Sequence, residues 1–198
     1  MTRIIAGQSK GRRLLVPTKG TRPTSDRVRE SLFNTLTSEL LAQDQAWSAL
    51  SVLDLYAGSG ALGIEAASRG AQPVLLVEKA RLAVETIRKN IDLVGLAGLQ
   101  VLATGVADLL IRPPSVAFTL VLADPPYDVP SNSLRDLLIS LVETGWVAPL
   151  ARVVIERPTW DPQSPLPETW IDFSQRRYGD TTLWYGRATK TMRRINGA

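Results

Sequence analysis

A glycine-rich turn between an apolar run and a helix-like segment constrains the fold of this chain more than any other feature. Residues 51–56 read Ser-Val-Leu-Asp-Leu-Tyr, which is typical of a buried strand, and Gly58, Gly60 and Gly63 follow at once. Glycine tolerates positive φ angles and lets the backbone approach a ligand closely. A strand, a glycine-rich turn and a helix N-terminus in this order predict an α/β unit in which a ligand binds against the turn.

Asp54, near the end of the same strand, indicates which ligand the turn binds. The spacing Gly58-x-Gly60-x-x-Gly63 also matches the fingerprint of dinucleotide sites, although a single match of that kind is weak. A carboxylate beside the turn would repel a phosphate, whereas S-adenosylmethionine has no phosphate and presents an ammonium and a sulfonium group. Asp54 therefore favours S-adenosylmethionine as the cofactor.

The rest of the chain repeats the alternation of strand and helix. Apolar runs predict strands at 73–78, 99–103, 118–123 and 151–156, and a terminal hairpin at 170–178 and 181–187. Helical periodicity predicts helices that start after Thr24 or Ser25 and at 61–69, 79–94 and 131–145, with 43–50 as a linker. The helix at 79–94 is expected to bury Leu82, Val84, Ile87, Ile91 and Val94. We therefore expect an α/β fold with a mostly parallel seven-stranded sheet, helices on both faces, and a small N-terminal β-hairpin from residues 3–6 and 13–16.

Acidic residues end or follow two further strands. Glu78 ends the strand at 73–78, where its carboxylate could accept both ribose hydroxyls of an adenosine, or could instead belong to the start of the next helix. Asp108 follows the strand at 99–103, where it could accept from the adenine N6 amine, or could be a surface residue of a short helix. The residues alone leave both alternatives open.

The motif Asp124-Pro125-Pro126-Tyr127 follows the apolar run at 118–123. Neither proline has an N–H group, so the strand ends at Asp124 and the chain continues as a stiff loop. An exocyclic base amine is a poor nucleophile, and two acceptors, the Asp124 carboxylate and the Pro125 carbonyl, would draw it towards tetrahedral geometry while the base stacks on Tyr127. A plain Asp-Pro turn is the alternative interpretation.

The composition excludes several classes of protein. The 198 residues contain no cysteine and no histidine, which removes disulfides, thiolate metal sites, and the usual zinc ligand and neutral-pH base. The sequence also lacks a long apolar run and an N-terminal apolar stretch, so we expect a cytoplasmic protein without a membrane span or a bound metal.

The net charge of +4 is unevenly distributed. Residues 1–30 carry +6 and residues 174–198 carry +5, so the middle carries −7. Basic ends around an acidic core indicate a polyanionic partner, although solvated basic tails would give the same pattern. Arg22, Arg27 and Arg29 gather at a predicted helix start, where they contact either phosphates or acids of the core.

The chain resembles a known family over essentially its whole length. The motifs that carry the resemblance are Arg3-Ile-Ile-Ala-Gly7 with Lys10-Gly-Arg-Arg-Leu14, residues 21–34 (Thr-Arg-Pro-Thr-Ser-Asp-Arg-Val-Arg-Glu-Ser-Leu-Phe-Asn), residues 54–65, residues 124–127, and Arg177-Tyr-Gly-Asp-Thr-Thr-Leu183. They are similar to those of the RsmD-type 16S ribosomal RNA (guanine-N2)-methyltransferases, which have the Rossmann-like fold of class I methyltransferases. The stretch Arg-Pro-Thr-Ser-Asp-Arg-Val-Arg-Glu is the most specific of them.

The resemblance implies methyl transfer from S-adenosylmethionine to N2 of guanine 966 in 16S rRNA, on a partly assembled 30S subunit. The sequence itself gives a weak case for a monomer. It implies a catalytic group of Asp124, Pro125 and Tyr127, a cofactor site of Asp54, Tyr56, Gly58, Gly60, Glu78 and Asp108, and RNA contacts from Lys10, Arg12, Arg13, Arg22, Arg27 and Arg29. Residues 1–20 are expected to be the basic hairpin extension, 21–189 the methyltransferase domain, and 190–198 a basic tail.

Three other functions are compatible with parts of the sequence. An adenine-N6 or cytosine-N4 DNA methyltransferase would use the same Asp-Pro-Pro-Tyr chemistry but would need a large target-recognition domain. A non-catalytic RNA-binding assembly factor would not need the complete set of site residues. A nicotinamide oxidoreductase is disfavoured by Asp54 and by the absence of histidine and of a Tyr-x-x-x-Lys pair.

Overall fold

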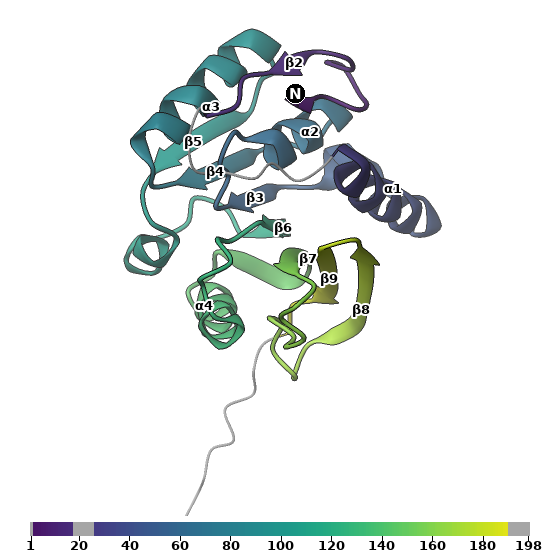
Figure 1. Cartoon of the computed structure of the whole chain (residues 1–198), viewed down its shortest axis with the longest axis vertical. Helices are drawn as coiled ribbons and strands as arrows, with labels where there is room; N and C mark the ends of the chain where they lie inside the picture. Colours follow the sequence, from purple (N-terminus) through teal and green to yellow (C-terminus); the bar gives the residue numbers. More distant parts are fainter. Residues whose placement is uncertain (1, 18–25, 190–198) are drawn as a thin grey trace, which may run out of the picture.

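The computed structural model describes residues 2–17 and 26–189, and its main feature is one seven-stranded sheet (Figure 1). The strands lie in the order β5-β4-β3-β6-β7-β9-β8. Neighbouring strands from β5 to β7 are parallel, and β9 is antiparallel to both β7 and β8. The sheet strands are β3 (Val52–Leu55), β4 (Val74–Glu78), β5 (Leu99–Ala103), β6 (Phe118–Ala123), β7 (Val147–Pro158), β8 (Ile171–Tyr178) and β9 (Thr181–Arg187). This arrangement confirms the predicted fold class.

Helices cover both faces of the sheet because successive residues of the central strands point to opposite sides. Val52 of β3 belongs to the core under one set of helices, whereas Leu53 and Leu55 belong to the core on the other face. The first face is covered by α1 (Asp26–Ala42), α2 (Ala61–Arg69) and α3 (Arg81–Val94). The second is covered by α4 (Ser131–Glu143) and the short 3-10 helix η2 (Val106–Ile111).

The N-terminal segment docks on the outer side of α2 and α3 (Figure 1). Its strands β1 (Thr2–Arg3) and β2 (Arg13–Leu14) pair antiparallel, so the predicted hairpin is confirmed, although each strand is shorter than expected. The buried Glu65 accepts from the N–H groups of Ile5 and Ala6, at 2.7 and 3.0 Å. Gly7 lies so close to α2 that an added Cβ would meet the Ser68 carbonyl oxygen at 1.8 Å. The loop between the two strands therefore bonds both to α2 and to its own backbone, where the N–H of Ile4 donates to the Arg12 carbonyl at 2.9 Å.

Three local expectations need correction. Leu82 is 64% exposed, because the buried face of α3 contains its neighbours Ala83 and Val84 and Leu82 lies off that face. The predicted linker at 43–50 contains the 3-10 helix η1 (Trp47–Ala49), and Trp47 is buried against Phe33 of α1. Strand β7 starts at Val147, four residues earlier than predicted, because Val147 pairs with Phe118 before a register shift. The proposed boundary between extension and domain lies in residues 18–25, outside the described residues, as do the expected caps Thr24 and Ser25.

Candidate active site

The parallel register brings the candidate site residues to one edge of the sheet. Leu55, Val77 and Ala123 are neighbours at the carboxyl ends of β3, β4 and β6. The glycine-rich turn, Glu78 and Asp124 follow these positions directly, and Asp108 follows β5 in η2. Ligands of open α/β sheets bind at this edge. The structure therefore places the predicted cofactor and base residues side by side, although they come from four separate segments.

Asp54 lies beneath the glycine-rich turn and is 1% exposed. Its Oδ2 accepts from the N–H of Gly63 at 2.8 Å, and its Oδ1 has no hydrogen-bond partner within the described residues. Burial raises the pKa of Asp54 to about 7; the hydrogen bond from Gly63 opposes this rise and the charge of Glu78 adds to it. A buried carboxylate with an unused oxygen fits a cationic ligand group and disfavours a phosphate.

The turn itself has the backbone geometry of a ligand-binding loop. Tyr56 has a φ of 57°, which is uncommon for a residue with a side chain and typical of functional sites. Gly60 has a φ of 80°, and a Cβ there would meet the Leu76 side chain at 2.9 Å. Asn90 of α3 donates to the Ser59 carbonyl at 2.9 Å and so holds the turn from the outside. The glycine-rich turn is thus packed against Leu76 of β4 and held by Asn90 of α3.

Glu78 links the turn to the adjoining strand. Its Oε2 accepts from the N–H of Gly58 at 2.9 Å, and its Oε1 accepts from the N–H of Ala80 at 2.8 Å. The carboxylate therefore also contacts the backbone just before α3, as the alternative interpretation expected. Each carboxylate oxygen can accept a second hydrogen bond, so ribose binding remains compatible with both contacts.

Asp108 is exposed and organises its own short helix. Its Oδ2 accepts from the N–H of Gly105 and from the hydroxyl of Thr104, both at 3.1 Å. Thr104 in turn donates its N–H to the carbonyl of Glu78 at 3.0 Å, which ties η2 to the end of β4. These contacts agree with the interpretation of Asp108 as a surface residue of a short helix. Its hydrogen bond with the adenine N6 amine stays a prediction.

The loop after β6 carries the predicted catalytic group. Asp124 is half-buried, Pro125 is buried, and Tyr127 is 36% exposed. The carbonyl of Pro126 accepts from Nη1 of Arg157 at 3.5 Å, and the Tyr127 ring lies edge-to-face with Trp160, with centroids 6.4 Å apart. The loop therefore presents a carboxylate beside an accessible aromatic ring.

Arg157 and Trp160 were missed by the sequence interpretation. Both lie at or just beyond the carboxyl end of β7, so they reach the same edge as Asp124. Arg157 is 1% exposed and donates from Nη2 to Asp161 at 2.9 Å. Its charge also lowers the pKa of Tyr56, although burial dominates and raises that pKa overall. The sequence did contain a signal for both residues. They come shortly after the strand predicted at 151–156, at the carboxyl end, where ligands of such sheets bind.

The predicted RNA-binding residues that the structure describes lie on two segments and differ in exposure. Lys10, Arg12 and Arg13 are exposed on the N-terminal segment, Arg27 is exposed on α1, and Arg22 lies outside the described residues. Arg29 is 1% exposed and bonds to Asp26 and to the carbonyl of Arg3. Direct RNA contact by Arg29 does not fit this position, and the alternative of packing against acids of the core is correct for it.

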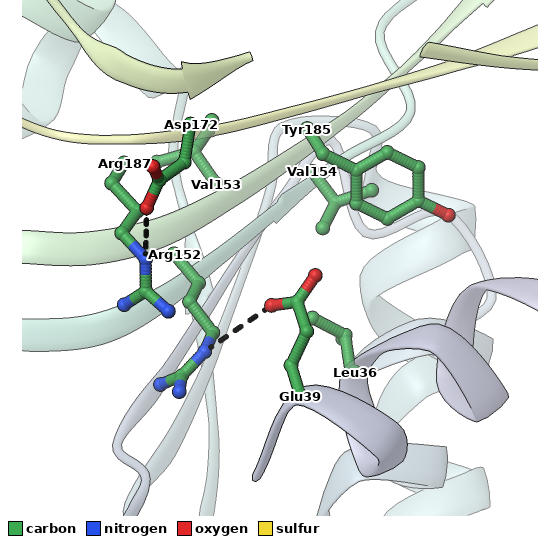
Figure 2. Close-up of a pocket in the computed structure, with 9 residues that line it drawn as sticks. Leu36, Glu39, Arg152, Val153, Val154, Asp172, Tyr185 and Arg187 are labelled. Atoms are coloured by element: carbon green, nitrogen blue, oxygen red, sulfur yellow. Dashed lines mark ion pairs between the residues drawn. The ribbon is translucent and has the colours of Figure 1, made fainter. Parts of the chain in front are cut away.

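A pocket of about 200 Å³ lies elsewhere, between α1 and strands β7–β9 (Figure 2). Glu39 of α1 pairs with Arg152 at 3.5 Å, and Asp172 pairs with Arg187 at 2.9 Å. Arg152 pairs in register with Leu120, near the amino end of β6. The pocket is therefore at the opposite edge of the sheet and does not belong to the candidate site.

No helix in the described ranges is both long and apolar enough to cross a membrane. Within the same ranges, no group of three or more aspartate, glutamate, histidine or cysteine side chains could hold a metal ion.

A sheet of this order, with a glycine-rich turn after one central strand and Asp-Pro-Pro-Tyr after its neighbour, defines a class I methyltransferase. Solved structures agree with this class. The putative methyltransferase yhhF from Escherichia coli superposes with a TM-score of 0.80 at 29% identity, over 96% of this chain and 98% of that one. The N-terminal domain of human METTL16, at 14% identity and a TM-score of 0.70, shares the fold.

Sequence comparison identifies the family. The family model described as "Conserved hypothetical protein 95" matches residues 2–187. Ribosomal RNA small subunit methyltransferase D of Escherichia coli K12 is 35% identical over 85% of this chain and 80% of that protein. Its namesake in Haemophilus influenzae is 34% identical over 89% of both chains. The chain therefore belongs to the ribosomal RNA small subunit methyltransferase D family, as the sequence motifs predicted.

Proposed function

We propose that this protein transfers a methyl group from S-adenosylmethionine to the exocyclic N2 amine of guanine 966 in 16S rRNA. The observation that carries the proposal is that the Asp124–Tyr127 loop and the Asp54 turn share one edge of the sheet. Family membership supports ribosomal RNA as the substrate, since the relatives are named for small-subunit rRNA methylation. A partly assembled 30S subunit is the expected form of that substrate.

The residues of the turn fit S-adenosylmethionine. The unused Oδ1 of Asp54 suits the methionyl ammonium, and the raised pKa of Asp54 reflects a buried carboxylate that a cation would stabilise. Glu78 would hold the ribose, and Asp108 would hold the adenine amine. When bound, the cofactor supplies a methyl group activated by a sulfonium centre.

The chain's own residues then prepare the nucleophile. Asp124 and the Pro125 carbonyl accept from the guanine amine, which localises its lone pair, and Tyr127 stacks on the base. The half-buried Asp124 also receives the proton that the amine loses, so no histidine is required. Positioning of the two reactants accounts for most of the rate, and the poorly solvated site favours a transition state in which charge disappears.

Two alternative functions are set against this proposal. A DNA adenine methyltransferase would use the same loop, but the relatives that share the chain's length are named for ribosomal RNA. A non-catalytic assembly factor would not require the buried Asp54 or the strained turn at Tyr56, both of which carry an energetic cost.

A labelled-methyl transfer assay tests the proposal. Small subunits and 16S rRNA from cells that lack this methylation are offered beside adenine-containing DNA. We expect label in N2-methylguanine at one position, and we expect Asp124→Ala to reduce turnover by roughly 100-fold or more while S-adenosylmethionine still binds. Label in DNA adenine would move the protein to the alternative enzyme, and cofactor binding without any transfer would favour the assembly factor.

Asp128→Ala is the matched control for that assay. Asp128 lies in the same loop and is exposed, so its loss removes one negative charge without touching the proposed amine site. The control separates a specific role of Asp124 from a general effect of charge near the RNA. Equal loss in both variants would contradict the role assigned to Asp124.

A further inference from the structure

Trp160 is exposed to an unusual degree for a tryptophan. Its side chain is 70% accessible, and it follows β7 at the same edge of the sheet as Asp124. Tryptophan side chains bury most of their surface in folded proteins, and they are enriched where a partner covers them. Because Trp160 also lies beside the candidate site, a ligand that covers it there would account for its exposure.

The backbone on both sides of Trp160 is held firmly. Thr159 donates its N–H to the carbonyl of Asp180 at 2.8 Å and its hydroxyl to the carbonyl of Gly179 at 3.0 Å. Asp161 accepts from Arg157 at 2.9 Å and from the Ser131 hydroxyl at 2.8 Å. Trp160 is thus the exposed tip of a pinned loop, so little entropy would be lost when a ligand covers it.

The orientation of Trp160 against Tyr127 excludes one mode of base binding. The two rings are 86° apart, with centroids separated by 6.4 Å. A planar base stacks only on a ring parallel to it, so these two rings cannot sandwich the same base. If Tyr127 stacks on the target guanine, the indole of Trp160 is available only to another base.

One exposed cation lies beside Trp160. Arg177 of β8 is exposed, and its Nη2 donates to the Thr159 carbonyl at 3.2 Å, next to Trp160. A cation beside an exposed aromatic ring is the usual combination in sites that bind unstacked nucleotides. The loop therefore offers one stacking surface and one positive charge to the same short stretch of RNA.

We propose that Trp160 stacks on the nucleotide next to the methylated guanine and holds it while the guanine occupies the Tyr127 site. The inference rests on the proposed function, since it takes the guanine to be the base on Tyr127. Extruding a base leaves its neighbour without a stacking partner, and Trp160 replaces that partner. Trp160 thus contributes to substrate binding and not to the transfer step itself.

The test uses the full-length protein with undermethylated small subunits. Trp160→Ala should weaken subunit binding roughly 5- to 100-fold, which is the effect of losing one base–aromatic stack, and should raise KM accordingly. The kcat at saturating substrate and the affinity for S-adenosylmethionine should stay within about twofold of wild type. Trp160→Phe should restore most of the binding, because phenylalanine retains a stacking face.

Two further readouts separate stacking from a structural effect. The affinity loss in Trp160→Ala should be the same at every salt concentration, because a stacking contact releases no counterions. Leu41→Ala is the matched control, since Leu41 is 72% exposed at the far end of α1. This control should bind like wild type.

The outcomes distinguish the two proposals. Unchanged subunit binding in Trp160→Ala, or a phenylalanine variant no better than alanine, would overturn the stacking contact. If such variants still transferred methyl groups to guanine, the proposed reaction would be retained. Binding that depends on Trp160 in a protein that transfers no methyl group would overturn the reaction and retain the contact.

Discussion

At the scale of single residues, burial determines the ionisation of Asp54. The carboxylate is 1% exposed and one of its oxygens lacks a partner within the described residues. Burial favours the neutral form, and its pKa is therefore raised to about 7. A bound cation would reverse this preference, so cofactor binding and the ionisation of Asp54 are linked.

The first prediction concerns the pH dependence of cofactor affinity. Below about pH 7 Asp54 is protonated in the free protein, and binding must release that proton, so the Kd of S-adenosylmethionine should rise up to about tenfold for each pH unit of acidification. Above pH 7 the Kd should level off. Calorimetric titration from about pH 5.5 to 8.5 measures this profile, and Asp54→Asn should bind weakly at all pH values. A wild-type profile that is flat across pH 7 would contradict the link.

The second prediction concerns Arg157, which joins the two loops of the site. Arg157→Met removes a buried cation that donates to Asp161 and to the Pro126 carbonyl, and it leaves the Asp161 carboxylate without its counter-charge, so the free energy of unfolding should fall by about 3 kcal/mol. Turnover should fall more than cofactor affinity, because the loop with Asp124 and Tyr127 loses its link to β7. Urea unfolding and methyl-transfer kinetics measure the two effects. Arg81→Met, at an 89% exposed side chain, is the control and should change stability by less than about 0.5 kcal/mol.

At the scale of elements, the N-terminal segment is held by side chains of the helices below it. Glu65 accepts from two backbone N–H groups of the segment and from Nε of Arg69 at 2.8 Å, and its side chain is fully buried. Asn90 both accepts from and donates to the backbone of Leu15, and it also holds the glycine-rich turn. The segment that displays Lys10, Arg12 and Arg13 is thus tied to the helices that frame the cofactor site.

The third prediction tests the docking of this segment. Glu65→Ala leaves three half-buried donors without this acceptor, so the free energy of unfolding should fall by about 3 kcal/mol and the backbone amides of Ile5 and Ala6 should exchange faster. Glu85→Ala removes an exposed partner with the same i,i+4 spacing and should cost less than about 0.5 kcal/mol. Urea titration and hydrogen exchange measure both. Similar losses of unfolding free energy in the two variants would contradict the prediction that the buried position of Glu65 makes its contacts stabilising.

At the scale of the whole molecule, the distribution of charge determines how the protein meets RNA. The first 30 residues carry +6 while the central part is acidic. Lys10, Arg12 and Arg13 are exposed on the docked segment, although Arg12 also donates to the Leu93 carbonyl at 2.6 Å. Cations on a fixed segment can contact phosphates without the cost of ordering a free tail.

The fourth prediction concerns salt dependence. If Lys10 and Arg13 each contact one phosphate, the double variant Lys10→Ala/Arg13→Ala should reduce the slope of log K against log salt by about 1.4 to 1.8. Filter binding to small subunits at several salt concentrations measures the slope. Arg112→Ala removes an exposed charge directly after η2, on the other face of the sheet from the docked segment, and should leave the slope unchanged. An unchanged slope in the double variant would place the RNA on another surface.

The sequence alone was sufficient to predict the order of the helices and strands and to locate the motifs at the carboxyl edge of the sheet. Strands β5, β6 and β9 have the predicted bounds, and Val84, Ile87 and Val94 of the apolar face predicted for α3 are buried. These features depend on periodicity and turn chemistry, which act between residues close together in the chain. Asp54, Glu78 and Asp124 could be found in the same way, because each lies at or near the carboxyl end of its own strand.

Only the tertiary structure decided which side chains are covered and which meet across the sheet. Arg29 has the sequence context of a phosphate ligand, yet it is buried because Asp26 and the Arg3 carbonyl fold over it. Trp160 meets Tyr127 because β6 and β7 are neighbours in the sheet, a pairing that no local pattern encodes. Exposure and contact between distant segments depend on packing over the whole fold, so the sequence determined the parts of the site and the packing determined how they work together.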